Sequence, residues 1–257
     1  PNPGDRNVTV NKLATQWQQK LNLTNPQVNR NTYLKRIEGL IYGEDPQQGF
    51  LENNIFYQPV LKFQFPVPQE WSYQNNPQSV QMAPKDGKAL MMLTLARGKS
   101  LQEAASNVLK QYNLQVRTSD NINVNGLNAI SMIADQVPQQ QGQQQQQQDV
   151  VRTLNYIIDY GGNFYHIVGV TTGTDFNVYS PYFTNTMQGF KVVTDPSIIN
   201  RKPERVRIKT VHKAGTLEQQ LQQYKVPAKR LEEMAILNGM TLKDQLPVGT
   251  LIKVIEK

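Results

Sequence analysis

The sequence predicts an α+β fold: short N-terminal helices, an antiparallel β-sheet packed by about two helices, and a small terminal unit of strand, helix, helix and strand. Three observations predict this class. Runs of β-type residues in the middle of the chain flank turn pairs such as Asp86-Gly87 and Asn125-Gly126. An apolar helical stripe begins at a capping sequence, Ser100 to Glu103. In the last fifty residues the apolar spacing changes from that of a strand to that of a helix and back.

Composition limits the classes of function. The 257 residues contain no cysteine, which excludes disulfides and thiolate chemistry, and no run of apolar residues is long enough to span a bilayer. Residues 201–257 hold twelve Lys and Arg against six Asp and Glu, so most of the net charge of +7 lies there. A basic segment suits phospholipid or wall polymers, or its charge only keeps it soluble. Tyr224 is its one aromatic residue, so we expect no nucleic acid partner.

Residues 1–48 are predicted to form a helical tail. Leu13, Trp17 and Leu21 recur at a spacing of four, and Tyr33, Ile37, Leu40 and Ile41 form a second apolar stripe. Residues 43–46, Gly-Glu-Asp-Pro, end that helix. Helices this short leave both stripes exposed, so we expect a partner outside this chain to cover them.

Residues 49–195 are predicted to form the antiparallel sheet. Strands are expected at 62–68, 79–83, 89–96, 116–124, 127–137, 150–160 and 164–171. Helices are expected after Ser100 and after Ser180-Pro181. Residues 139–148 are Gln apart from Gly142, and this tract is predicted to be a long mobile hairpin loop. A linker with Pro196 and Pro203 is expected over residues 196–203.

One motif gives the sheet region a resemblance. Residues 63–71 read Phe-x-Phe-Pro-x-Pro-x-x-Trp, a helix follows the second hairpin strand, and Phe183 and Phe190 stand near the end. In these features the region resembles the PsbP-like fold. Members of that fold are mostly scaffolds and adaptors, so the resemblance implies protein contact rather than turnover.

Residues 204–257 are predicted to form the βααβ module. Thr216 caps the first helix, Pro227 opens the second, and residues 251–255 close the module as a strand. Residues 213–255, from Lys-Ala-Gly-Thr-Leu to Leu-Ile-Lys-Val-Ile, resemble the LysM domain, a carbohydrate-binding module of bacterial cell walls. The acidic residue that usually precedes Thr216 is missing, and Lys225 replaces a usual Gly.

The LysM resemblance implies that glycan contacts come from two loops, residues 213–217 and 238–242. The candidate glycan- or partner-binding residues are therefore Lys213, Gly215, Thr216, Asn238, Met240 and Thr241. The alternative is a LysM-shaped spacer that binds nothing, or that binds protein.

The residues give no sign of catalysis. The two histidines, His166 and His212, are too few for a usual zinc site, and no HExxH is present. His166 lies on an apolar strand face and is expected to be a core residue. Gly98-Lys99-Ser100 ends like a phosphate-binding loop, but Leu93 stands where that motif needs Gly. We predict no catalytic and no metal-binding residues in this chain.

The front of the chain carries a third resemblance. Its strings are residues 1–6, residues 33–50 with Gly-Leu-Ile-Tyr-Gly-Glu-Asp-Pro, and Phe56-Tyr57-Gln58-Pro59. Together they resemble the segment C-terminal to the catalytic domain in bacterial envelope zinc metallopeptidases of the HtpX, BepA and CAAX-protease family. Gln58 stands where many relatives have His. The resemblance implies that this chain is a non-catalytic C-terminal region, and that HExxH and zinc belong to an absent catalytic domain.

The sequence therefore predicts an accessory region of a zinc metalloendopeptidase in the bacterial periplasm or cell envelope, with a role in protein quality control. Its expected partners are its own peptidase domain, protein substrates or envelope proteins, and peptidoglycan. The alternatives are a free-standing wall-binding or adaptor protein without an enzymatic parent, and a small independent hydrolase.

Overall fold

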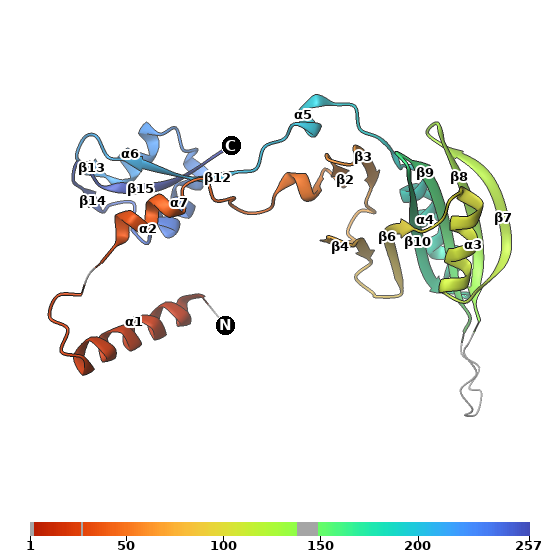
Figure 1. Cartoon of the computed structure of the whole chain (residues 1–257), viewed down its shortest axis with the longest axis horizontal. Coiled ribbons are helices and arrows are strands. Elements are labelled where there is room, and N and C mark those ends of the chain that lie inside the picture. The colour runs from red at the N-terminus through yellow and green to blue at the C-terminus, as the bar shows by residue number, and fades with distance from the viewer. Residues whose placement is uncertain (1–2, 27, 138–148) are drawn as a thin grey trace. The chain divides into compact units, whose positions relative to one another are not determined.

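The computed structural model describes residues 3–26, 28–137 and 149–257, so the predicted Gln-rich loop at 139–148 lies outside the described residues. The chain divides into two compact units. One unit, called the small unit below, combines residues 1–42 with residues 205–257; the other, called the sheet unit, comprises residues 43–204 (Figure 1). The α+β class is confirmed.

The sheet unit contains a seven-stranded antiparallel sheet. In spatial order its strands are β4 (Ser72–Asn76), β5 (Ser79–Ala83), β6 (Ala89–Ala96), β10 (Asn163–Thr172), β9 (Val151–Tyr160), β8 (Leu127–Gln136) and β7 (Leu114–Val124). The hairpins predicted at Asp86-Gly87 and Asn125-Gly126 are confirmed, because β5 pairs with β6 and β7 with β8. The strands β9 and β10 form a third hairpin, with Gly161-Gly162 at its turn. Asn125 and Gly126 both have positive φ, as a two-residue hairpin turn requires.

Two helices cover opposite faces of this sheet. The helix α3 (Leu101–Gln111) packs on Ile130, Met132 and Ile157, and it begins as predicted, with the Ser100 hydroxyl accepting from the Glu103 N–H. The helix α4 (Phe176–Gln188) packs on the other face, among a larger aromatic core. A Cβ on Gly169 of β10 would lie 2.3 Å from the Phe183 ring, so only glycine lets α4 approach this closely.

A second, four-stranded sheet closes the aromatic core. Its order is β1 (Phe50–Glu52), β2 (Ile55–Gln58), β3 (Phe63–Pro66) and β11 (Lys191–Val192), and a 3-10 turn, Pro46–Gln48, precedes it. Phe56, Phe63 and Phe65 point from this small sheet into the core. The predicted linker contains a short helix, α5 (Pro196–Ile199), whose first turn is capped by the Asp195 carboxylate.

The small unit contains the predicted βααβ order. The strands β12 (Arg205–Thr210) and β15 (Leu251–Glu256) pair antiparallel and enclose α6 (Leu217–Gln223), a 3-10 turn (Ala228–Arg230) and α7 (Leu231–Asn238). A two-residue ladder joins β13 (Gly215–Thr216) to β14 (Gln245–Leu246). Leu217, Leu221, Met234, Ile252 and Val254 form the buried centre of the unit.

Residues 30–42 belong to the small unit. The helix α2 (Arg30–Arg36) buries Leu34, and the Arg30 guanidinium donates to the Leu251 carbonyl at 2.9 Å. Beyond α2, Gly39 and Leu40 exchange backbone hydrogen bonds with Val206, and Ile41 forms a β-bridge with Arg205. This segment therefore extends the edge of β12.

Two predicted helices differ from the structure. The predicted stripe Tyr33 to Ile41 does not stay helical, because α2 ends at Arg36 and Gly39, with a φ of 81°, turns the chain toward β12. The helix predicted to begin at Ser180-Pro181 begins at Phe176 instead. The burial of Phe176 and Tyr179 draws that extra turn into the helix, so Pro181 lies inside it.

The first helix, α1 (Pro3–Lys20), leaves its apolar side chains exposed. Leu13 and Trp17 retain 49% and 54% of their accessible surface, and Leu21, directly after the helix, retains 57%. Among the helices of the described residues, we find none with the length and apolar content that a membrane crossing needs.

Candidate functional site

The predicted glycan-binding residues lie in two loops at one end of the βααβ unit. The first loop enters α6 through a reciprocal cap: the Thr216 hydroxyl accepts from the Gln219 N–H, and the Gln219 side chain accepts from the Thr216 N–H. The second loop leaves α7 at Gly239, whose left-handed φ of 66° ends the helix. Each loop is therefore attached to a fixed helix end, the first to the start of α6 and the second to the end of α7.

Backbone hydrogen bonds join the end of the first loop to residues 242–246, the segment in which the second loop ends. Gly215 pairs with Leu246 and Thr216 with Gln245. The Leu217 N–H donates to the Asp244 carbonyl at 2.9 Å, and the Glu218 N–H donates to the Leu242 carbonyl at 3.1 Å. The structure thus brings Gly215 and Thr216 beside the segment that follows Thr241.

A side-chain turn fixes the second loop. The Asp244 carboxylate accepts from the Thr241 hydroxyl at 2.6 Å and from the Thr241 N–H at 3.1 Å. These hydrogen bonds hold the pKa of the exposed Asp244 carboxyl below its usual range, and the bond from the Thr241 hydroxyl has the largest effect. Asp244 was not predicted as a site residue, although a Thr-x-x-Asp pattern is a recognisable turn signal.

The other candidates have structural contacts. The Asn238 amide donates to the Met234 and Lys253 carbonyls and accepts from the Lys253 N–H at 2.8 Å, so it ties α7 to β15. Met240 is half-buried against the core of the small unit. The Lys213 side chain is exposed, and the Lys213 carbonyl accepts from the Gln220 amide at 2.9 Å. Of the polar candidate side chains among the described residues, only that of Lys213 thus has no hydrogen bond within the protein.

Gln220 was missed from the sequence. It is 1% exposed and lies beneath the first loop, and its Oε1 has no hydrogen-bond partner among the described residues. A polar residue one position before Leu221 gives no signal of burial in the sequence, because the helical stripe is defined by its apolar members.

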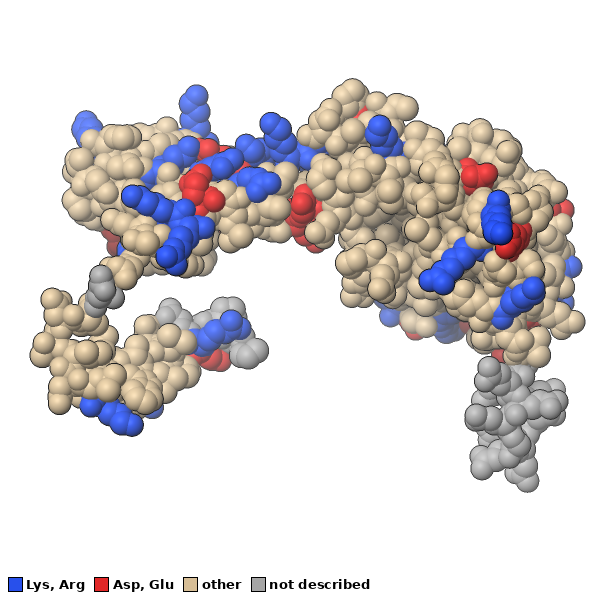
Figure 2. Space-filling model, viewed as in Figure 1, with Lys and Arg blue, Asp and Glu red and all other residues tan. Residues whose placement is uncertain are grey.

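The small unit carries an excess of basic side chains. Figure 2 shows Lys and Arg side chains gathered over the part of the small unit that contains β12. Arg205, Arg207 and Lys209 come from that strand. Glu38 accepts from Arg207 at 3.2 Å, and Glu256 accepts from Lys209 at 2.9 Å. These ion pairs do not neutralise the unit, because its residues 205–257 carry ten Lys and Arg against five Asp and Glu.

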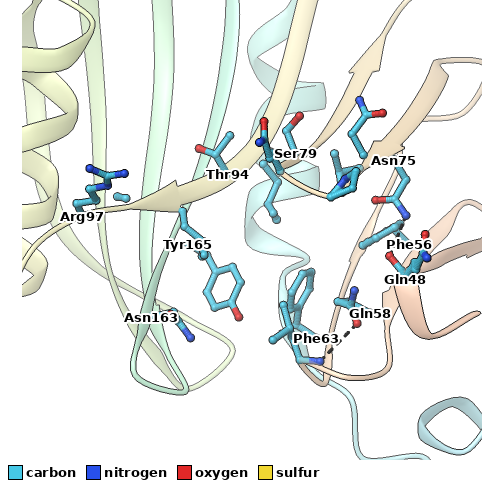
Figure 3. Close-up of a pocket in the computed structure, with 18 residues that line it drawn as sticks. Gln48, Phe56, Gln58, Phe63, Asn75, Ser79, Thr94, Arg97, Asn163 and Tyr165 are labelled. Atoms are coloured by element: carbon cyan, nitrogen blue, oxygen red, sulfur yellow. Dashed lines mark hydrogen bonds between the residues drawn. The ribbon is translucent and has the colours of Figure 1, made fainter.

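The sheet unit has a hollow of about 1020 Å³ between the four-stranded sheet and the strands β5, β6 and β10. Figure 3 shows Thr94, Arg97 and Tyr165 on one side and Gln48, Asn75 and Ser79 on the other. At the base of the hollow the Phe63 and Tyr165 rings pack edge to face, with their centroids 5.0 Å apart. Burial raises the pKa of the Tyr165 phenol, with a further rise from Tyr160, so Tyr165 is a neutral donor there.

The described residues contain no cluster of metal-binding side chains. Nowhere in the described ranges do three His, Asp or Glu side chains gather as metal ligands would. His166 lies in the core as predicted, 1% exposed, with its Nε2 at 3.0 Å from the Asn155 Oδ1. Burial lowers the pKa of His166 to about 4, which keeps the imidazole neutral.

No family model matches the sequence, and no curated protein matches it. Several solved structures are similar. Cyanobacterial PsbP (CyanoP) from Synechocystis covers 54% of this chain and 91% of its own at 10% identity, with a TM-score of 0.41. The Ran-binding protein Mog1p from Saccharomyces cerevisiae covers 58% of this chain and 99% of its own at 12% identity, with a TM-score of 0.42.

A third similar structure is LpqN, a protein involved in cell envelope biogenesis of Mycobacterium tuberculosis. It covers 51% of this chain and 83% of its own at 7% identity, with a TM-score of 0.36. All three TM-scores are below 0.5, so we transfer the function of none of these proteins to this chain.

Proposed function

We propose that this chain is a non-catalytic recognition region of the bacterial cell envelope, and that its small unit binds peptidoglycan through the loops 213–217 and 238–242. The observation that carries the proposal is the pair of backbone bonds from Leu217 and Glu218 to the 242–244 segment, which hold the end of the first loop beside the end of the second. A preformed pair of loops binds without the entropy cost of ordering them.

The groups at this end suit a hydroxyl-rich polymer that carries some negative charge. Lys213 supplies an exposed ammonium, and the Thr216 and Thr241 hydroxyls are held at fixed positions by Gln219 and Asp244. Such groups accept and donate to sugar hydroxyls and acetamido groups. The basic surface of the unit would add a salt-sensitive attraction to the same polymer.

We further propose that the region belongs to a zinc metallopeptidase of the envelope, and that its sheet unit recognises protein substrates or envelope proteins. The resemblance over residues 1–65 motivates this parent. The exposed Leu13 and Trp17 of α1, with Leu21 directly after it, are the surface that a peptidase domain would cover. Because no ligand cluster for zinc exists among the described residues, the metal would be held entirely by that domain.

Pelleting with purified insoluble peptidoglycan tests the glycan part. We expect the full chain to be retained at low salt and at 1 M NaCl, and Lys213→Glu to reduce retention about tenfold, the effect of losing one charged hydrogen bond. Lys229→Glu makes the same charge change on an exposed position outside both loops and is the matched control. Retention that high salt abolishes, or equal loss in both variants, would reduce the interaction to net charge.

The protein sequence encoded upstream of residue 1 tests whether this region belongs to a zinc metallopeptidase. We expect an HExxH helix there, followed by a third zinc ligand. An upstream sequence without HExxH would contradict the peptidase parent and leave the wall-binding or adaptor protein.

A further inference from the structure

The strand β6 has one edge that is paired over only part of its length. On one side β10 pairs with all of it, from Ala89 with Thr171 to Ala96 with Phe164. On the other side β5 pairs only with Met91, Met92 and Leu93. Among the described residues, Thr94 to Ala96 therefore have no β-partner on that side. Their outward N–H and C=O groups are free to pair with another strand.

The same three residues line the hollow of the sheet unit, which also contains Arg97. In β6, Met91 and Leu93 face the aromatic core and are 0% and 7% exposed. Leu95 continues this row two residues later, yet it is 57% exposed. Leu95 is uncovered because it lies where the hollow begins. It therefore offers an apolar contact beside the unpaired backbone edge.

The walls of the hollow are suited to a polypeptide. They carry amide and hydroxyl side chains, which can donate to and accept from a peptide backbone: Gln48, Asn76, Gln78, Ser79, Thr94 and Asn163. Leu61, 43% exposed, adds a second apolar group. Among the described residues that line the hollow, Arg97 is the one charged residue, so the site favours a segment with an acidic side chain near that end.

The outer edge of β7, at the far side of the same sheet, makes an instructive contrast. It is longer, but seven consecutive residues, 115–121, are exposed, and they include Arg117 and Asp120. A register shift between Val116 and Thr118 interrupts the strand. Charges and bulges of this kind prevent edge pairing, whereas Thr94 to Ala96 lie beside buried aromatic rings.

From these observations we propose that the hollow binds an extended, apolar and acidic polypeptide segment that adds as a strand to Thr94–Ala96 of β6. Main-chain hydrogen bonds give such complexes their affinity, and alternate side chains give specificity. The segment places one side chain against Leu95 and an acidic one beside Arg97. This inference deepens the proposed recognition of proteins by the sheet unit and rests on that function.

Fluorescence anisotropy with a labelled, reduced and carboxymethylated α-lactalbumin, an unfolded acidic polypeptide, tests the site in the full chain. We expect Leu95→Glu to weaken binding at least tenfold and Arg97→Ala about threefold. Leu90→Glu changes the same residue type in the same strand, at a position 39% exposed and outside the hollow, and we expect its affinity to stay within twofold of wild type. Circular dichroism checks that each variant is folded.

Hydrogen exchange on the wild-type chain tests the strand addition without a mutation. We expect the polypeptide to slow amide exchange within residues 94–97 and to leave β7 unchanged. Equal binding by Leu95→Glu and Leu90→Glu, with no protection at 94–97, would overturn the β6 site while protein recognition by the chain stands. A wild-type chain that does not bind the polypeptide at all would overturn both.

A chitin oligosaccharide, chitohexaose, is the competing probe. Binding of chitohexaose that Leu95→Glu abolishes and Leu90→Glu keeps would make the hollow a glycan site and overturn the assignment of a polypeptide. We expect chitohexaose to leave the polypeptide bound.

Discussion

In the sheet unit, long antiparallel ladders and an aromatic core hold the backbone, whereas in the small unit single polar side chains hold it. The ladders of β6, β8, β9 and β10 run over seven or more paired residues each. In the small unit, Asn238 holds β15, Tyr224 donates to the Thr210 carbonyl at 2.6 Å, and Arg205 donates to the Gly39 carbonyl at 2.7 Å. A small unit with a short sheet has few backbone hydrogen bonds between strands. Hydrogen bonds from side chains therefore hold more of its backbone in place.

The difference predicts where each unit is vulnerable. The β6 edge is part of a continuous sheet and keeps its position when one surface contact is lost. The loops of the small unit depend on a few side chains, so a single polar substitution should change them. Four substitutions or conditions test this contrast, from the largest expected effect to the smallest.

Phe183→Ala should have the largest effect, confined to the sheet unit. Phe183 is 0% exposed and packs on Gly169 and Trp71. Its truncation should lower the free energy of unfolding by about 3 to 5 kcal/mol, measured by urea denaturation. Val178→Ala, on an exposed position of the same helix, should change it by less than about 0.5 kcal/mol. Equal effects of the two would show that α4 does not pack as described.

Mild acid should also destabilise the sheet unit. The His166 pKa of about 4 lies below the unfolded value of 6.5, so the unfolded chain binds more protons between these pH values. Stability is complete above pH 6.5 and falls by about 3 kcal/mol as the pH drops to 4. Denaturation at a series of pH values measures the slope, and His166→Gln should flatten it. An unchanged slope in that variant would assign the acid sensitivity to other groups.

Asn238→Ala tests the small unit. The substitution removes three hydrogen bonds and leaves the Lys253 N–H and C=O without their side-chain partner. We expect a loss of about 2 kcal/mol, seen as faster amide exchange in α7 and β15 and unchanged exchange in the sheet unit. Asn31→Ala, at an exposed position of α2, is the control. If Asn238→Ala had no effect, ladder and core contacts alone would hold the small unit.

Glu38→Ala should have the smallest effect. The Glu38 carboxylate accepts from the Ile208 N–H and from the Arg207 guanidinium, and both side chains are partly exposed. Because solvent screens such a pair, we expect a loss of about 1 kcal/mol, measured by amide exchange at Gly39 and Val206. Glu38→Gln keeps an acceptor for Ile208 and should lose about half as much. A larger loss with Gln than with Ala would contradict this role of the carboxylate.

Local signals in the sequence predicted most of the sheet. The pairs Asp86-Gly87, Asn125-Gly126 and Gly161-Gly162 fix hairpins because their geometry needs positive φ, and the Ser100 cap fixes the start of α3. The start of α4 predicted from Ser180-Pro181 was wrong. The helix begins at Phe176 because Phe176 and Tyr179 are buried by contacts that are distant in sequence.

The sites were harder to predict than the fold. A resemblance predicted the two loops of the small unit as binding loops, which stays a prediction. The sequence did not show that Asn238 would hydrogen-bond to Lys253 or that Gln220 would be buried. The hollow was missed, because it depends on where β5 stops pairing with β6. Nothing in the residues Thr94 to Ala96 themselves marks that point.

The bridge between Ile41 and Arg205 has a consequence for synthesis of the chain. The ribosome makes α2 before the whole sheet unit, and β12 and β15 after it. Domains usually fold in the order of their emergence, but residues 30–42 have to wait with Leu34 uncovered until the C-terminal strands appear. The small unit therefore matures after the sheet unit, and a chain stalled before residue 205 would display residues 30–42 without their partner strands to proteases and chaperones.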